Sequence, residues 1–177
     1  MTMTHRPPVA IVVMGVQGIG KTTTGRMLAS RLGVPFTDGD SLHPARNVAL
    51  MAAGTPLDDE DREPWLRLVG DTIAQHAASG GVVVSCSALK RAYRDTLRAH
   101  APSLYIVEPW GPIELISARI AARSHEYMPP TLLQSQYDTL EPLEADEFGI
   151  RVSVEQSPER VVDQILADYL ARVEETQ

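Results

Sequence analysis

The sequence predicts an α/β fold in which a five-stranded parallel sheet carries helices on both faces. Two observations lead to this prediction. Short apolar runs alternate with segments of helical periodicity from Val9 to the end of the chain, which is the pattern of parallel sheets with crossover helices. The first apolar run also leads directly into a glycine-rich loop and then into a helical segment, an arrangement typical of α/β proteins that bind phosphate groups.

That loop, Gly15–Thr22, fits the pattern G-x-x-x-x-G-K-[ST] at every fixed position. A strand is expected over Val9–Met14 and a helix over Lys21–Leu32. Glycines let backbone N–H groups turn toward phosphate oxygens, while Lys21 reaches the β- and γ-phosphates and the Thr22 hydroxyl ligates Mg²⁺. A bare glycine turn is the alternative, but such a turn does not need the Lys-Thr pair. The sequence therefore predicts a P-loop NTPase whose nucleotide lies on Gly15, Val16, Gln17, Gly18, Ile19, Gly20, Lys21, Thr22 and Thr23.

The composition is that of one globular domain. The 177 residues are 44% hydrophobic and 22% charged, as in ordinary soluble domains, and we expect a flexible leader over 1–8 and a single domain over 9–177. The net charge of -7 without a basic run weighs against a nucleic-acid partner. The single cysteine, Cys86, excludes an internal disulfide, and the apolar run at 9–16 is too short to cross a bilayer. These features predict a cytoplasmic protein without a membrane partner.

Two aspartates, Asp38 and Asp40, lie at the end of the second predicted strand, Val34–Asp38. The carboxyl ends of parallel strands line the ligand crevice, so Asp38 and Asp40 are expected to face the phosphate loop. They could hold Mg²⁺ or accept a hydrogen bond from a substrate hydroxyl, and a solvated turn is the alternative. The third strand, Val82–Cys86, ends without the aspartate that many phosphate-loop proteins use for the metal. The metal's carboxylate is therefore expected from the second strand.

The segments between the strands are expected to be helical. One helix follows Pro44 and ends near Ala53, and a longer one runs from Pro64 to Ser79 behind a cluster of acidic residues that favours a helix N-terminus. The helix expected over 88–100 carries the cations Lys90, Arg91 and Arg94. Because this helix follows a strand end, the cations are expected near an anionic substrate. An exposed basic helix face is the alternative.

A further pair of cations, Arg119 and Arg123, lies one turn apart at the end of the helix expected over 112–122, after a strand over 103–107. They open a segment over 119–130 whose polar, proline-terminated end suits a mobile lid. Arginines on a lid stabilise the charge of a phosphoryl group in transfer, and an ordinary surface pair is the alternative. Helices over 131–140 and 158–173 and a strand over 151–154 complete the predicted fold.

Several segments beyond the phosphate loop carry a family resemblance. They are Phe36–Pro44, Pro56–Asp59, Asp61-Arg62, Pro64–Leu66, Cys86–Lys90, Leu115–Arg123, Ser135-Gln136 and Thr139–Glu141. In these segments, which are spread over nearly the whole chain after the leader, the sequence resembles the small P-loop gluconate kinases. The resemblance implies a nucleoside-monophosphate-kinase-like fold, shared with shikimate kinases, and phosphorylation of the 6-hydroxyl of D-gluconate by ATP and Mg²⁺, often in a homodimer. Two departures are Leu50, where the family commonly has a lysine nearby, and the lid sequence Arg123–Tyr127, which lacks the family's usual lysine.

Gluconate carries a carboxylate and a row of hydroxyls, so its site needs cations and hydrogen-bond acceptors. The residues expected at the carboxylate are Lys90, Arg91, Arg94 and Arg46, and those expected at the hydroxyls are Asp40 and His43. The expected catalytic residues are Lys21, Asp40 and Arg123, with Arg119 at the nucleotide and Thr22 and Asp38 at the metal. Asp40 is the preferred acceptor of the 6-hydroxyl proton. The alternatives are a kinase of shikimate or of another small hydroxy-acid, and a nucleotide-binding regulator without turnover.

Overall fold

The sheet has five parallel strands in the order β2-β3-β1-β4-β5. The computed structural model describes residues 6–123 and 130–176. The strands are β1 (Val9–Val13), β2 (Phe36–Asp38), β3 (Gly81–Ser85), β4 (Tyr105–Trp110) and β5 (Gly149–Ser153). The fully buried strand β1 lies at the centre, paired on one side with β3 and on the other with β4. The predicted five-stranded parallel sheet is confirmed.

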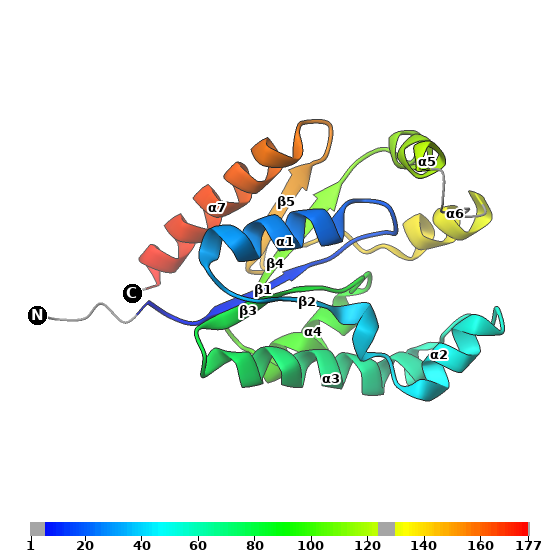
Figure 1. Cartoon of the computed structure of the whole chain (residues 1–177), viewed down its shortest axis with the longest axis horizontal. Coiled ribbons are helices and arrows are strands. Elements are labelled where there is room, and N and C mark those ends of the chain that lie inside the picture. The colour runs from blue at the N-terminus through cyan, green and yellow to red at the C-terminus, as the bar shows by residue number, and fades with distance from the viewer. Residues whose placement is uncertain (1–5, 124–129, 177) are drawn as a thin grey trace, which may run out of the picture.

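Helices cover both faces of this sheet (Figure 1). On one face lie α1 (Lys21–Leu32) and α7 (Pro158–Glu175), and on the other α3 (Asp59–Ala77) and α4 (Arg91–His100). The alternation of side chains along β1 separates the two cores, because neighbouring residues of a strand point to opposite faces. Ile11 belongs to the core under α1 and α7, whereas Val12 belongs to the core above α3 and α4.

Three further helices lie beyond the carboxyl ends of the strands, at the end of the molecule opposite to the two termini (Figure 1). They are α2 (Ala45–Ala52), α5 (Ile113–Ala122) and α6 (Pro130–Thr139). A short 3-10 turn, η1 (Gly39–Leu42), connects β2 to the α2 region. These elements surround the same edge of the sheet that carries the phosphate loop.

Two helices begin at other residues than the sequence predicts. Helix α3 begins at Asp59 rather than Pro64, because Asp58 and Asp61 form a reciprocal capping box in which each carboxylate accepts the other's backbone N–H, at 2.8 and 3.2 Å. The acidic cluster therefore caps the helix as expected, with Pro64 inside the first turns. Helix α4 begins at Arg91 rather than residue 88, since Ala88 has a φ of 40°, which is incompatible with a right-handed helix.

Two predictions fall partly outside the described residues. Residues 1–5 of the expected leader and residues 124–129 of the expected lid belong to this part of the chain. Within the described residues, none of the helices has the length and apolar character needed to cross a membrane.

Candidate active site

The phosphate loop connects β1 to α1 at the carboxyl edge of the sheet. Gly20, with a φ of 98°, precedes α1 without any side-chain cap, so the first N–H groups of the helix are open to an anion. Gly18 has a φ of 80°, and a Cβ placed on it would lie 2.6 Å from Ile120 of α5. The loop backbone therefore packs closely against α5, and a side chain at this position would separate the two.

Lys21 lies across the loop that it belongs to. Its Nζ donates hydrogen bonds to the carbonyl oxygens of Gly15 at 2.9 Å and Val16 at 3.0 Å. Burial lowers the pKa of Lys21, and this effect is opposed by the negative charges of Asp40 and Asp38. The predicted lysine and the two aspartates thus lie close enough to interact at one edge of the sheet.

A cavity of about 300 Å³ opens on the α5 side of the loop, and we call it the α5 cavity. It is lined by Gly18, Ile19, Gly20, Thr23, Thr24, Arg119, Arg123, Val154, Gln156, Pro158 and Val161. Arg119 is held in place by a hydrogen bond of 2.7 Å from its guanidinium to the carbonyl oxygen of Val154. Both arginines expected to contact the nucleotide therefore stand beside the glycines of the loop.

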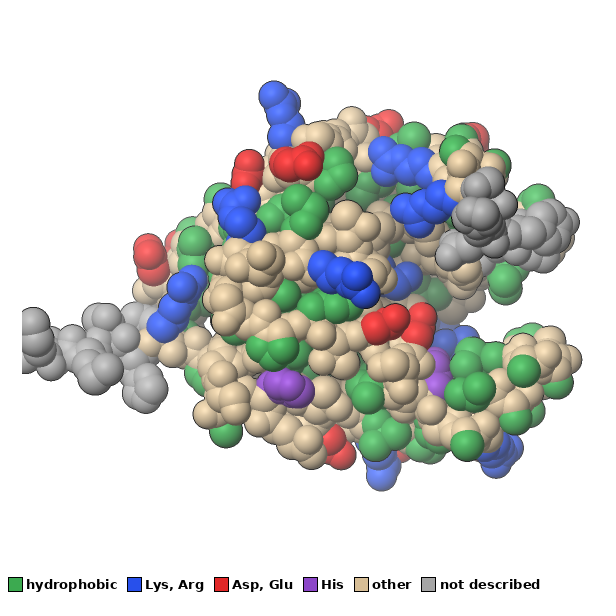
Figure 2. Space-filling model, viewed as in Figure 1, with side chains coloured by type: hydrophobic (Ala, Val, Ile, Leu, Met, Phe, Trp, Pro, Cys, Tyr) green, Lys and Arg blue, Asp and Glu red, His purple; other side chains and the backbone are tan. Residues whose placement is uncertain are grey.

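A second cavity, of about 550 Å³, opens on the other side of the loop, and we call it the α3 cavity. Its lining comprises Gln17, Lys21, Asp40, His43, Met51, Gly54, Thr55, Pro56, Leu57, Arg62, Trp65, Ser87, Leu132 and Gln136. The end of the molecule that carries these residues shows acidic and basic side chains around a hollow between the α5–α6 part and the α2 part (Figure 2). Because Lys21 lines this cavity and glycines of its loop line the other, the loop separates two compartments.

The turn after β2 presents its aspartates through a close backbone approach. A Cβ on Gly39 would lie 2.3 Å from the carbonyl oxygen of Ser85, so the turn can pass β3 only with glycine there. Asp38 caps η1 by accepting the Asp40 N–H at 2.9 Å and also accepts from the Ser85 hydroxyl at 3.4 Å. Asp40 itself is exposed and lines the α3 cavity.

His43 is oriented by two neighbours, Trp65 and Asn47. Its ring stacks on Trp65 with centroids 4.1 Å apart, and the indole N–H of Trp65 donates to the carbonyl oxygen of Gly39 at 2.8 Å. The side-chain amide nitrogen of the buried Asn47 lies 2.8 Å from the carbonyl oxygen of Asp61 and 3.3 Å from His43 Nδ1. An amide nitrogen only donates, so Nδ1 accepts and a neutral His43 carries its proton on Nε2.

The charge state of His43 follows from its surroundings. Burial lowers its pKa, and Arg62 acts in the same direction, while Asp40 raises it. The imidazole is therefore neutral at pH 7, and it can offer its Nε2–H as a hydrogen-bond donor to a ligand in the α3 cavity.

Three of the cations predicted for the substrate lie outside the α3 cavity. Arg46 is 80% exposed and pairs with Asp61 at 3.4 Å. Lys90 pairs with Asp59 at 3.3 Å. Arg91 pairs with Glu144 and with both oxygens of Asp146, at 2.7 and 2.9 Å. Each of these cations has a carboxylate partner, and none lines the cavity.

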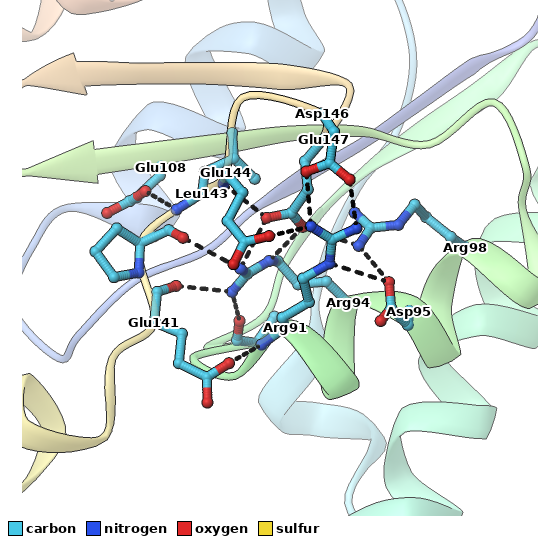
Figure 3. A network of polar contacts seen from close by, with 12 residues as sticks. Arg91, Arg94, Asp95, Arg98, Glu108, Glu141, Leu143, Glu144, Asp146 and Glu147 are labelled. Carbon is cyan, nitrogen blue, oxygen red and sulfur yellow. Dashed lines mark hydrogen bonds and ion pairs between the residues drawn. The ribbon is translucent and has the colours of Figure 1, made fainter.

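Arg94 is fully buried in an ion-pair network behind α4 (Figure 3). Its Nε and one terminal nitrogen donate to Glu147 at 2.8 and 2.9 Å, and its other terminal nitrogen donates to the carbonyl oxygens of Ala88, Leu89 and Glu141. Its hydrogen-bonding groups are thus directed at the protein. The expectation that Arg94 binds a substrate carboxylate disagrees with this placement.

Sequence reasoning missed a cation that the structure brings into the α3 cavity. Arg62 of α3 lines it, with its guanidinium carbon 5.7 Å from the centre of the Tyr93 ring. Arg62 lies three residues before Trp65, and residues at this spacing share one face of a helix. The helix face that carries the buried indole was therefore the available signal.

The donors near the loop suit Mg²⁺. Thr22 is exposed on the first turn of α1, and Asp38 stands at the carboxyl end of β2; hydroxyl and carboxylate oxygens are hard ligands of the kind that this ion prefers. The described part of the chain contains no group of three or more acidic, histidine or cysteine side chains placed to hold a metal. The pair of Thr22 and Asp38 fits Mg²⁺ because this ion usually takes one or two protein ligands and otherwise phosphate and water.

A phosphate loop placed between two cavities, with arginines on one side and an aspartate and a histidine on the other, defines a P-loop kinase of small molecules. The model of the shikimate kinase family matches residues 17–169. A gluconokinase of Gluconobacter oxydans is 43% identical over 93% of both chains, and a probable gluconokinase of Xenopus tropicalis is 43% identical over 88% of this chain and 90% of its own. The solved structure of a gluconokinase from Sinorhizobium meliloti, 42% identical, superposes with a TM-score of 0.88 over 97% of both chains. The chain belongs to the shikimate kinase family of P-loop enzymes and, within it, to the gluconokinases.

Proposed function

We propose that this kinase transfers the γ-phosphoryl group of ATP to the 6-hydroxyl of D-gluconate, giving 6-phospho-D-gluconate and ADP. The observation that carries the proposal is the α3 cavity, where Lys21 and Asp40 meet a neutral His43 and the cation Arg62. A sugar acid needs this combination of a cation for its carboxylate and polar groups for its hydroxyls. The gluconokinase relatives support the choice of gluconate.

The roles of the residues follow from the two compartments. ATP occupies the α5 cavity with its phosphates on residues 15–23, and Arg119 and Arg123 contact its phosphate chain from the C-terminal end of α5. Gluconate occupies the α3 cavity, with its carboxylate on Arg62 in place of the predicted Lys90, Arg91, Arg94 and Arg46. His43 donates from Nε2 to a hydroxyl, and Asp40 accepts the proton of the 6-hydroxyl as it attacks.

Phosphoryl transfer depends mainly on alignment and on neutralising charge. Lys21 exchanges its contacts with Gly15 and Val16 for the β- and γ-phosphates. The burial that lowers the pKa of Lys21 favours this exchange, because the phosphates give the buried ammonium group a negative partner. Thr22 and Asp38 would hold Mg²⁺, which supplies further positive charge at the phosphates.

The proposal extends to assembly and location, which the resemblance and the buried Cys86 support. We expect a homodimer in the cytoplasm, where ATP is available and thiols stay reduced. Light scattering of the purified protein measures the first of these, and a monomer at micromolar concentration would contradict it.

The decisive experiment measures ADP release with Mg-ATP against gluconate, shikimate and a set of other sugar acids in parallel. Turnover with gluconate far above the other acids is the expected result. Turnover with shikimate instead, or none with any acid, would overturn the proposal. In the same assay Asp40→Asn is expected to lower kcat by about a hundredfold, and turnover close to that of the wild type would remove Asp40 from the reaction.

A further inference from the structure

Gln136 of α6 makes a contact that the phosphate-binding role of the loop does not explain. Its side-chain oxygen Oε1 accepts a hydrogen bond of 2.6 Å from the backbone N–H of Gln17, a residue 119 positions earlier in the chain. Backbone N–H groups of such a loop are the donors that bind phosphate oxygens. One backbone donor of the loop, the Gln17 N–H, is therefore already hydrogen-bonded to a side chain of the protein.

The position of this N–H between the two cavities indicates which phosphate group it can contact. Gly18, Ile19 and Gly20 line the α5 cavity, whereas Gln17 and Gln136 line the α3 cavity with Lys21 and Asp40. The Gln17 N–H thus lies on the side of the loop that faces the α3 cavity, where gluconate is proposed to bind. A phosphoryl group that passes from one compartment to the other comes within reach of it.

Helix α6 is anchored on both sides of Gln136. Leu133 is buried in a cluster with Val16 and Ile19 of the loop, and the Tyr137 hydroxyl donates to the carbonyl oxygen of Gly111 at 2.9 Å. Side chains at these spacings fix the direction in which a helix presents the residue between them. The carboxamide is therefore held at the loop by packing as well as by its own hydrogen bond.

We propose that Gln136 is a catalytic residue of phosphoryl transfer, whose carboxamide contacts the transferred phosphoryl group. In the structure Oε1 accepts from the Gln17 N–H. A γ-phosphate oxygen competes for the same donor, and two acceptors do not share it well. A half turn about the last side-chain torsion replaces Oε1 by Nε2, because the two atoms of a carboxamide are nearly equal in shape.

After that turn the same side chain donates to the oxygen that displaced it. The Gln17 N–H and the Gln136 amide then both point at the phosphoryl group, next to Lys21. Donors fixed before the reaction at a site of developing charge lower the barrier of the chemical step. The inference concerns the γ-phosphate and rests on the proposed kinase function.

The test compares Gln136→Glu and Gln136→Ala with Gln134→Ala. Gln134 is an exposed glutamine on the same helix that pairs with Asp138 and lies outside both cavities, so it is the matched control. Glutamate keeps the shape and the acceptor but loses the donor and adds a negative charge. We expect Gln136→Glu to lower kcat by about a hundredfold and Gln136→Ala by about tenfold, with Gln134→Ala unchanged.

A binding measurement separates this role from a structural one. By calorimetry, Gln136→Glu is expected to raise the Kd of a non-hydrolysable ATP analogue by more than about tenfold. The Kd of ADP, which lacks the γ-phosphate, is expected to change by less than about threefold. Equal losses for both nucleotides, or a kcat for Gln136→Glu close to that of the wild type, would overturn the assignment. Since this arm needs no gluconate, it remains decisive for Gln136 even if the wild type proves to phosphorylate a different acid.

Discussion

Two groups of arginines in this molecule have opposite uses. Arg91, Arg94 and Arg98 lie on α4 and form ion pairs with Glu144, Asp146 and Glu147 in the loop before β5 (Figure 3). Arg62, Arg119 and Arg123 line the two cavities. The first group holds two distant segments of the protein together, and the second borders the cavities proposed for the ligands.

The difference lies in partners that are distant in sequence. In the sequence both groups contain arginines one turn apart in a predicted helix. What distinguishes them is a set of carboxylates that the topology brings from about fifty residues later onto α4. An arginine saturated by such partners is unavailable to a substrate, and the comparison can be tested by changing one member of each group.

The largest effect is expected for the cation at the boundary of the cavities. Lys21→Ala removes the charge that faces the transferred phosphoryl group, so we expect kcat to fall by about a thousandfold. His43→Ala removes one neutral hydrogen bond to a substrate hydroxyl and is expected to cost about tenfold. Steady-state kinetics of the two folded variants test the ranking, and equal losses would contradict it.

In the ion-pair network the effect is expected in stability. Arg94→Met leaves Glu147 buried with only Arg98 as its cation, and breaking a fully buried pair costs about 3 kcal/mol or more of the free energy of unfolding. Urea denaturation measures the loss, and the double variant with Glu147→Met should recover part of it. A variant of full stability whose KM for gluconate rises steeply would instead restore Arg94 to the substrate site.

Arg62 is expected to show the reverse pattern. Arg62→Ala removes the cation proposed for the gluconate carboxylate, and we expect kcat/KM for gluconate to fall by about a hundredfold through KM. The urea midpoint should stay close to that of the wild type, because the side chain borders a cavity. Arg62→Lys is the control, since it keeps the charge without the planar fork. An unchanged KM in Arg62→Ala would exclude this contact.

The same contrast marks the limit of what the sequence predicts. The parallel sheet, the phosphate loop and the turn at Asp38–Asp40 follow from local patterns, because strand periodicity and glycine spacing are written in neighbouring residues. The cavity lining does not follow in this way. Arg62 and Gln136 line the cavity because of the orientation of their helices, which depends on packing. Arg94 lies outside the cavity because it pairs with Glu147, 53 residues away.

Acid offers a finer test of the network. Burial raises the pKa of Glu147, but hydrogen bonds from Arg94, the Glu144 backbone and Arg98 outweigh this and lower it to about 2. Because the folded pKa lies below the ordinary value, the contribution of Glu147 to stability is complete above about pH 4.5 and is lost as the pH falls toward 2. Glu147→Gln should therefore flatten the stability profile in that window, measured by thermal melts. A profile as steep as that of the wild type would assign the acid sensitivity to other carboxylates.

The smallest effect is expected at the exposed edge of the network. Arg91 is 30% exposed at its side chain and pairs with Glu144 and Asp146 in contact with solvent, where ion pairs contribute little and are screened by salt. Arg91→Ala should lower the melting temperature slightly at low ionic strength and not measurably at high salt, with kcat and KM unchanged. A rise in the KM for gluconate at unchanged stability would show that Arg91 leaves its carboxylates when substrate binds, and the division between the two groups of arginines would then not hold for the complex with substrate.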